Sequence, residues 1–178
     1  MAVLVEAISV VVLRASIDAR FPGGWANFQN AVPNDTLCFD AEIARVGFMA
    51  PEDVKGFIAH LESSGLRFLV NGDAEDIAVV DQLKGLTVRA PWLESGTIRV
   101  TDPEGQLTVC RALGSLDEEL AVPDGWKFEG SLSERTSFMT DDEAKTDLQF
   151  LRTEGGLDVY LNKVTSKEVY VGRTARDH

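Results

Sequence analysis

Residues 47–72 of this 178-residue chain read GFMAPEDVKGFIAHLESSGLRFLVNG, which predicts a helix followed by a β-hairpin. Pro51 is suited to the first helical position, and Glu52 and Asp53 place acids at the positive end of the helix dipole. Gly65 is suited to the left-handed conformation that ends many helices. The apolar residues recur with helical period and form one stripe, which comprises Val54, Phe57, Ile58 and Leu61. We therefore expect this helix to cover a flat apolar surface.

The segments that surround this helix have the composition of β-strands. Phe68–Val70 and Ile77–Val80 are expected to pair around Asn71-Gly72, a strong hairpin signal. Thr97–Val100 and Leu107–Cys110 are expected to pair across the turn sequence TDPEG. These pairings predict antiparallel sheet.

A second stretch near the C-terminus repeats this order of features. Arg45 aligns with Arg135, and the following Phe-Met pairs align as well. Thr140 and Glu143 have capping-box spacing, which predicts a second helix that ends at Gly155. Its expected stripe is Ala144, Leu148 and Leu151, and Leu157–Leu161 and Val169–Val171 are the expected strand pair after it. We interpret the two stretches as diverged copies of a helix-strand-turn-strand unit, with chance similarity as the alternative.

The Pro-x-Gly-Trp sequence also occurs twice, at residues 22–25 and 123–126, before each expected unit. The predicted fold is an α+β domain in which antiparallel sheet dominates and a few helices cover one side. We expect a single compact domain over residues 1–178. Its parts are the pseudo-repeats 45–80 and 135–172, a strand-rich insert at about 86–113 and a connector at 114–125.

The composition restricts the partners. The net charge of −12 and the pI of about 4.5 disfavour binding to nucleic acid, because a phosphate backbone would be repelled. A basic protein partner is compatible with this charge, and so is solubility alone. Cys38 and Cys110 are expected to be buried free thiols in a reducing, cytoplasmic compartment.

The apolar start of the chain predicts a strand rather than a leader or a membrane span. No Lys or Arg precedes the apolar run, Glu6 interrupts it, and it is too short to cross a bilayer. Val3–Leu13 is rich in Val and Ile and is expected to be a strand buried on both faces. We expect no membrane partner.

Six residues are candidates for binding. Arg45 and Arg135 are suited to hold an anion or a carboxylate, with pairing inside the protein as the favoured alternative. Trp25, Trp92 and Trp126 lie beside Gly or Pro in predicted loops, where a tryptophan either closes the core or anchors a ligand or partner.

Asp81, the sixth candidate, follows an expected buried strand. A carboxylate there can act as a general base with a raised pKa, but more often it accepts backbone hydrogen bonds in the next turn. Cys38 and His60 form only a weak candidate nucleophile pair. The acids of NGDAED (residues 71–76) lack the spacing of an EF-hand loop. The sequence therefore predicts no catalytic residue, no metal site and no cofactor.

Two functional hypotheses follow. The first is a non-enzymatic binding or protein-interaction module with an unidentified protein or small-molecule ligand. The second is a small-molecule sensor or enzyme with a carboxylate-centred pocket, so that an enzymatic role stays open. A homodimer is also compatible with a duplicated unit.

Overall fold

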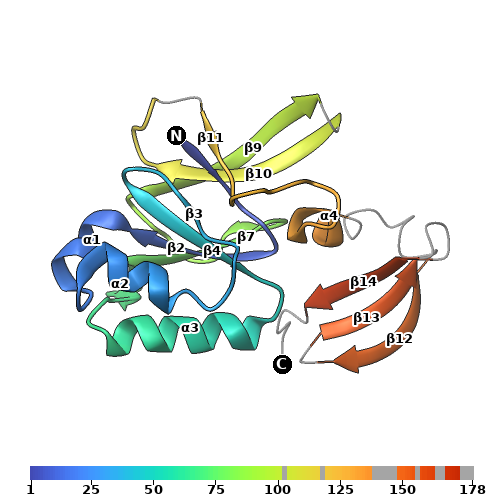
Figure 1. The fold of residues 1–178 in the computed structure, drawn as a ribbon, viewed down its shortest axis with the longest axis horizontal. Coiled ribbons are helices and arrows are strands. Elements are labelled where there is room, and N and C mark those ends of the chain that lie inside the picture. The colour runs from blue at the N-terminus through green and yellow to red at the C-terminus, as the bar shows by residue number, and fades with distance from the viewer. Residues whose placement is uncertain (102–103, 117–118, 138–147, 155–156, 163–166, 173–178) are drawn as a thin grey trace.

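The computed structural model describes residues 1–101, 104–116, 119–137, 148–154, 157–162 and 167–172. Over these residues the chain combines helices with mostly antiparallel sheets, as predicted (Figure 1). The helices are α1 (Arg14–Arg20), α2 (Gly24–Ala31), α3 (Pro51–Ser63) and α4 (Leu132–Ser137). The strands of the first half are β1 (Ala2–Leu4), β2 (Ile8–Leu13), β3 (Cys38–Phe39), β4 (Ile43–Phe48), β5 (Leu69–Val70), β6 (Asp73–Ala74), β7 (Ile77–Asp81) and β8 (Gly85–Leu86). Those of the second half are β9 (Leu93–Thr101), β10 (Glu104–Ala112), β11 (Leu120–Ala121), β12 (Leu148–Glu154), β13 (Leu157–Asn162) and β14 (Lys167–Gly172).

The core is built in three layers. A five-stranded antiparallel sheet, β3-β4-β2-β7-β8, lies in the middle. The helices α1, α2 and α3 cover one of its faces (Figure 1). The four-stranded sheet β11-β1-β10-β9 packs against the other face, and its β1–β11 pair is parallel.

Because the middle sheet is covered on both faces, its strands are apolar at successive positions. In β2, Val10 and Val12 pack toward the helices, whereas Val11 packs toward the four-stranded sheet. All six residues of β4 are buried, and these include Arg45. A charged side chain is thus enclosed between the two sheets.

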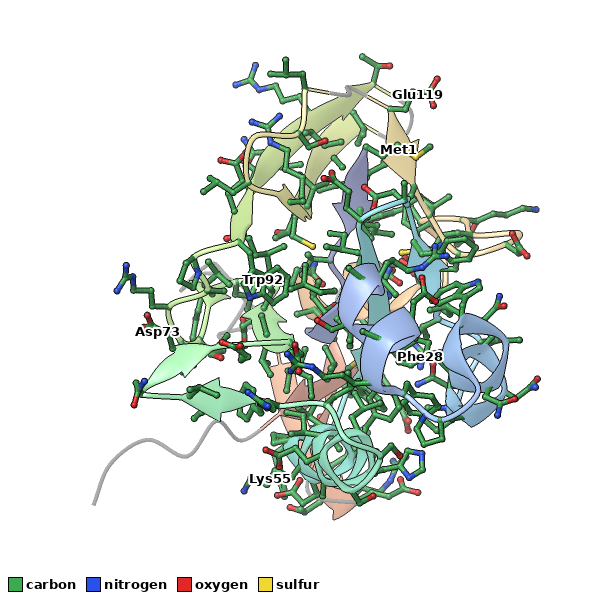
Figure 2. The ribbon with its side chains drawn as sticks, turned by 90° about the vertical axis from the view of Figure 1, so that its left-hand side faces the viewer. Met1, Phe28, Lys55, Asp73, Trp92 and Glu119 are labelled. Carbon is green, nitrogen blue, oxygen red and sulfur yellow. The ribbon has the colours of Figure 1, made fainter. Side chains whose placement is uncertain are left out.

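The helix predicted from residues 47–72 is confirmed. α3 begins with Pro51 in its first turn, and its stripe is buried against the middle sheet. Gly65 has a φ of 104°, the left-handed conformation expected after the helix end. Phe28 of α2 completes this helical layer (Figure 2).

The prediction of one strand over Val3–Leu13 is wrong, because the chain changes sheets in the middle of this run. β1 belongs to the four-stranded sheet and β2 to the five-stranded sheet. Ala7 between them has a φ of 47° and donates its N–H to Gln82 Oε1 at 2.7 Å. Ser9 Oγ closes the corner, since it accepts from Glu6 N at 3.1 Å and donates to Glu6 O at 2.9 Å.

The hairpin after α3 is shorter than predicted. Asn71 and Gly72, with φ of 55° and 88°, form the turn between β5 and β6. Strand β7 pairs with β2 and β8, so it is a member of the middle sheet and not the partner of β5. The predicted pairing across TDPEG is confirmed, since β9 and β10 are antiparallel with Thr97 opposite Thr108. The expected connector at 114–125 contains β11.

The structure does not show the internal duplication. Arg45 lies in a strand and Arg135 in helix α4, so the aligned arginines are not equivalent. The helix expected up to Gly155 is wrong over its last part, because residues 148–154 are strand β12. The start of that expected helix lies outside the described residues.

The strands of the C-terminal sheet pair in sequence order. The strand pair predicted after residue 155 is confirmed as β13 and β14, and β12 adds a third antiparallel strand. Leu151, a member of the expected helical stripe, lies in β12 and is 39% exposed, so the stripe is not buried at this residue. β14 lies against α4 (Figure 1).

Candidate functional site

A buried ion pair joins the two sheets. Arg45 is 0% exposed and Glu6 2% exposed, and Arg45 Nη2 lies 3.5 Å from Glu6 Oε2. The guanidinium also donates from Nε to Leu4 O at 2.5 Å and from Nη1 to Thr36 O at 3.1 Å. Among the described residues Arg45 Nη2 has no hydrogen-bond acceptor, so its charge depends on the carboxylate beside it.

The second oxygen of Glu6 holds the segment before α4. Glu6 Oε1 accepts from Trp126 Nε1 at 2.8 Å, from Ser133 Oγ at 2.9 Å and from Ser133 N at 3.2 Å. Two donors from α4 and one from the turn before it therefore converge on one carboxylate oxygen. The ion pair fixes the orientation of the Trp126 indole.

Glycine at position 47 makes room for this pair. A Cβ there would lie 2.9 Å from Arg45 Nη1 and 3.3 Å from Leu132 Cδ1. Gly47 N donates to Thr36 Oγ1 at 2.7 Å, which draws the loop before β3 against β4. A glycine within a strand often marks such a close approach.

Glu6 of the ion pair also lines an open pocket of about 380 Å³. Its lining includes Glu6, Thr36, the half-buried Trp126 and Arg135. Further carboxylates and one ammonium complete the lining, from Asp35, Asp124, Glu129 and Lys127. We call this hollow the Trp126 pocket. Two of the predicted candidates, Trp126 and Arg135, line it, whereas Arg45 is not a lining residue but contacts its lining residues Glu6 and Thr36.

Trp25 does not line this pocket. The prediction that it lies in a loop is wrong, because it belongs to helix α2. Its ring stacks on Phe28 at 5.6 Å and meets Phe39 edge-on at 4.8 Å. The Arg14 guanidinium lies 3.6 Å from the ring centroid of Trp25, a cation–π contact. Trp25 therefore packs against the helical layer and is not brought to the Trp126 pocket.

Trp92 and Asp81 are occupied by local contacts. Trp92 lies in the predicted loop, and its Nε1 donates to Ala74 O at 3.0 Å (Figure 2). Asp81 Oδ1 accepts from Leu83 N at 2.8 Å and from Lys84 N at 3.1 Å. This is the turn arrangement that the sequence favoured over a general base.

Two acids of the NGDAED segment, Asp73 and Asp76, have protein partners. Asp76, 2% exposed, accepts from Ser16 Oγ at 2.7 Å, Arg20 Nη1 at 2.6 Å and Arg67 N at 2.8 Å. Asp73, at the β5–β6 hairpin, pairs with the exposed Arg89 at 3.2 Å (Figure 2). In the part of the chain that the structure describes, no three His, Cys, Asp or Glu side chains are grouped to hold a metal ion.

The thiols do not have the environment of a nucleophile. Cys38 and Cys110 are both free and buried, as predicted. Burial raises the pKa of Cys38 to about 11, an effect that the neighbouring Arg45 partly offsets, and burial also raises the pKa of Cys110. Cys38 packs between the two sheets, whereas His60 lies on the exposed side of α3 beside Phe21. The candidate Cys38–His60 pair is not brought together.

Sequence reasoning missed Glu6 and Ser133. The signal for Glu6 was present, because a single acid inside the apolar run AVLVEAISVVV is expected to need a buried partner. Ser133 has no comparable signal, since its role depends on where α4 is placed.

Comparison with known proteins gives no relative. The sequence matches no protein-family model and no curated protein, and the structure matches no solved structure. Among the described helices, none has the length and apolar character needed to cross a membrane.

Proposed function

We propose that this protein is a non-enzymatic binding module that recognises basic side chains of a polypeptide partner at the Trp126 pocket. The observation that carries the proposal is an indole held in place by the buried Glu6–Arg45 pair while it lines an open pocket. A fixed aromatic ring loses little conformational entropy on binding, which makes it an effective anchor.

The charges around the ring favour a cationic ligand. The exposed acids Asp35, Asp124 and Glu129 line the same pocket, and the whole chain carries a net charge of −12. A guanidinium or ammonium over an indole is stabilised by about 0.5–2 kcal/mol, and nearby carboxylates add attraction that weakens with salt. Lys127 and Arg135 also line the pocket, which favours a ligand that exposes carbonyl oxygens beside its cation.

The chemistry of the site supports binding rather than catalysis. Glu6 is the buried carboxylate of this pocket, and its oxygens are engaged by Trp126, Ser133 and Arg45. A general base must reach a substrate proton, whereas Glu6 is 2% exposed and its Oε1 already accepts three hydrogen bonds, which supports a binding role.

A labelled peptide tests the proposal. The probe is an acetylated, amidated octapeptide of alternating arginine and glycine, and its partner control has glutamate in place of arginine. Fluorescence anisotropy should give a saturable isotherm for the arginine peptide, with affinity that falls several-fold between low and physiological salt.

Two surface substitutions provide the matched variants. Neutralising Asp124 and Glu129 together, as Asp124→Asn and Glu129→Gln, should weaken binding about three- to tenfold without a change in melting temperature. Neutralising Asp18 and Glu62, which are exposed acids on α1 and α3 and line neither hollow, removes the same net charge elsewhere and should weaken binding less. Equal effects of the two pairs would mean that only net charge matters, and the pocket assignment would fail.

The alternative function, a small-molecule sensor, has a separate readout. A metabolite present at a hundred times its dissociation constant adds about 2.7 kcal/mol of stability, which a thermal-shift screen detects. A hit that Trp126→Phe abolishes, together with no arginine-peptide binding, would replace the polypeptide proposal by a sensor function.

A further inference from the structure

A second hollow lies on the other side of the same loop. It is an open groove of about 690 Å³ between α3 and the segment that follows α2. Pro33 and Asn34 line this groove, whereas the next two residues, Asp35 and Thr36, line the Trp126 pocket. Residues 33–36 therefore form a shared wall. We call this hollow the α3 groove.

The floor of the α3 groove is aromatic. Phe48 of β4 and Phe57 of α3 meet at a ring-centroid distance of 5.4 Å, and both line the groove. Only 6% and 5% of their surfaces are exposed, so the floor is anchored in the core beneath α3. A side chain that enters the groove would contact aromatic carbon on one side and Pro33 on the other.

Gly56 lines the groove and contributes no side chain to it. It lies in the interior of α3, where glycine is less favourable than alanine by about 1 kcal/mol. No close packing explains it, because a Cβ at Gly56 would meet no atom within 4 Å. Since Gly56 lines the groove, its missing side chain leaves open space where a ligand can approach the helix backbone.

The charge of the rim defines the ligand further. Glu52 and Asp53 line the groove at its α3 side, and both are exposed. Among the described lining residues there is no Lys or Arg. Lys55 lies on α3 but is not among the residues that line the groove (Figure 2). An apolar floor with an acidic rim is complementary to an apolar side chain that is flanked by a cation.

We infer that the α3 groove is a second recognition site, which binds a leucine-like side chain of a basic polypeptide and pairs its neighbouring Lys or Arg with Glu52 and Asp53. It adds an apolar anchor, and so a sequence preference, to the cation binding proposed for the Trp126 pocket. It does not require that pocket to be occupied. The two sites are close enough along residues 33–36 to be contacted by one polypeptide.

Two peptides separate the groove from the pocket. One is the arginine–glycine octapeptide, and the other has leucine in place of each glycine. Burying one leucine side chain should make the arginine–leucine peptide at least about tenfold tighter for the wild-type protein. Gly56→Leu should remove this gain and leave the affinity for the arginine–glycine peptide unchanged. Ala59→Leu, which adds the same bulk at an exposed position of α3 outside the groove lining, should preserve the gain.

The melting temperature of each variant shows whether it folds. Gly56→Ala is the milder second variant, and it should reduce the gain partly while the helix is kept or strengthened. If both Gly56 variants still bind the arginine–leucine peptide more tightly than the arginine–glycine peptide by the wild-type factor, the groove assignment would be overturned. A self-association detected by sedimentation and abolished by Gly56→Leu would identify the occupant as a second copy of this chain and would overturn the proposal of a basic partner.

A ¹⁵N-correlation spectrum distinguishes failure of this inference from failure of the proposed function. On addition of the arginine–leucine peptide, the Gly56 amide reports the groove and the Trp126 indole reports the pocket. Shifts at Trp126 without shifts at Gly56 would overturn only the groove. Shifts at Gly56 alone would support the groove and overturn the pocket, and shifts at neither would overturn both.

Discussion

Replacing Glu6 with glutamine is expected to destabilise the fold strongly, although the two side chains have nearly the same shape. In the wild-type protein Arg45 is fully buried, and its Nη2 lies 3.5 Å from the Glu6 carboxylate and has no hydrogen-bond partner among the described residues. Glutamine has one acceptor and one donor where glutamate has two acceptors. Its NH₂ group must face either Arg45 Nη2 or the donors of Trp126 and Ser133, so a donor meets a donor in both orientations.

The expected magnitude follows from the loss of one partner of a buried ion pair. Such a loss typically costs about 3–5 kcal/mol, because the remaining charge stays out of water. For a chain of this length each kcal/mol lowers the melting temperature by about 2–4 °C, so a decrease of roughly 6–20 °C is expected. Arg45→Met should lower the melting temperature by a similar amount, because it leaves the Glu6 carboxylate buried without its cation.

Urea denaturation followed by tryptophan fluorescence measures these free energies. The double variant Glu6→Gln with Arg45→Met should be less destabilised than the sum of the single variants, with a coupling of at least about 2 kcal/mol. Glu62→Gln, at an exposed position of α3, is the control and should stay within about 0.5 kcal/mol of the wild type. A Glu6→Gln cost below 1 kcal/mol, or additive single effects, would refute the reasoning that this pair holds the site together.

Three further predictions concern stability. Burial raises the pKa of Cys38 from 9.0 to about 11 and also raises that of Cys110, so the unfolded state loses these protons first. The free energy of unfolding should therefore be unaffected by the thiols below pH 9 and fall between pH 9 and 11 by about 1.4 kcal/mol per pH unit for each thiol. A variant with both cysteines changed to alanine should show a shallower decline in the same pH series, and an identical slope would contradict this. Gly56→Ala should raise the melting temperature by about 2–4 °C in a thermal melt, whereas a decrease would mean that the glycine has a structural role. Asp76→Asn should cost about 1–3 kcal/mol in urea denaturation, because Asp76 accepts three hydrogen bonds, and an unchanged midpoint would contradict the importance of these contacts.

Local signals in the sequence were sufficient for the elements that form independently of their surroundings. The residues of α3 specify its start, its buried stripe and its end within one continuous segment, and the structure agrees. The β9–β10 pair is likewise defined by two apolar runs on either side of a turn sequence. Both predictions depended on neighbours in the chain and not on distant partners.

Predictions failed where a distant contact decides the conformation. The strand break at Glu6 is formed by Gln82, Trp126 and Ser133, all far away in the sequence. Residues 148–154 carry Leu148 and Leu151 at a spacing that fits a helix, yet their pairing with β13 makes them a strand. A short apolar pattern does not distinguish these outcomes without knowledge of the partner strand.

For the candidate site, the sequence identified some of the residues but not how they are arranged. Arg45 and Arg135 were identified because they recur in the two aligned stretches, and Trp126 because it lies beside a glycine in a predicted loop. The convergence of Trp126 and Arg135 on one pocket depends on the Glu6 contact that positions the turn before α4. Trp25 and Trp92 were equally plausible by type, and packing places them apart from that pocket.

The central claim is that the surface on both sides of residues 33–36 binds a basic polypeptide. A titration of ¹⁵N-labelled protein with the arginine–leucine peptide, in low salt, tests it most directly. The account predicts saturable shifts that include the Trp126 indole and the Gly56 amide, and that are largely absent from residues lining the hollow beside β9 and β10, such as Thr97 and Arg111. Shifts spread evenly over exposed acids, or no shifts at millimolar peptide, would contradict it.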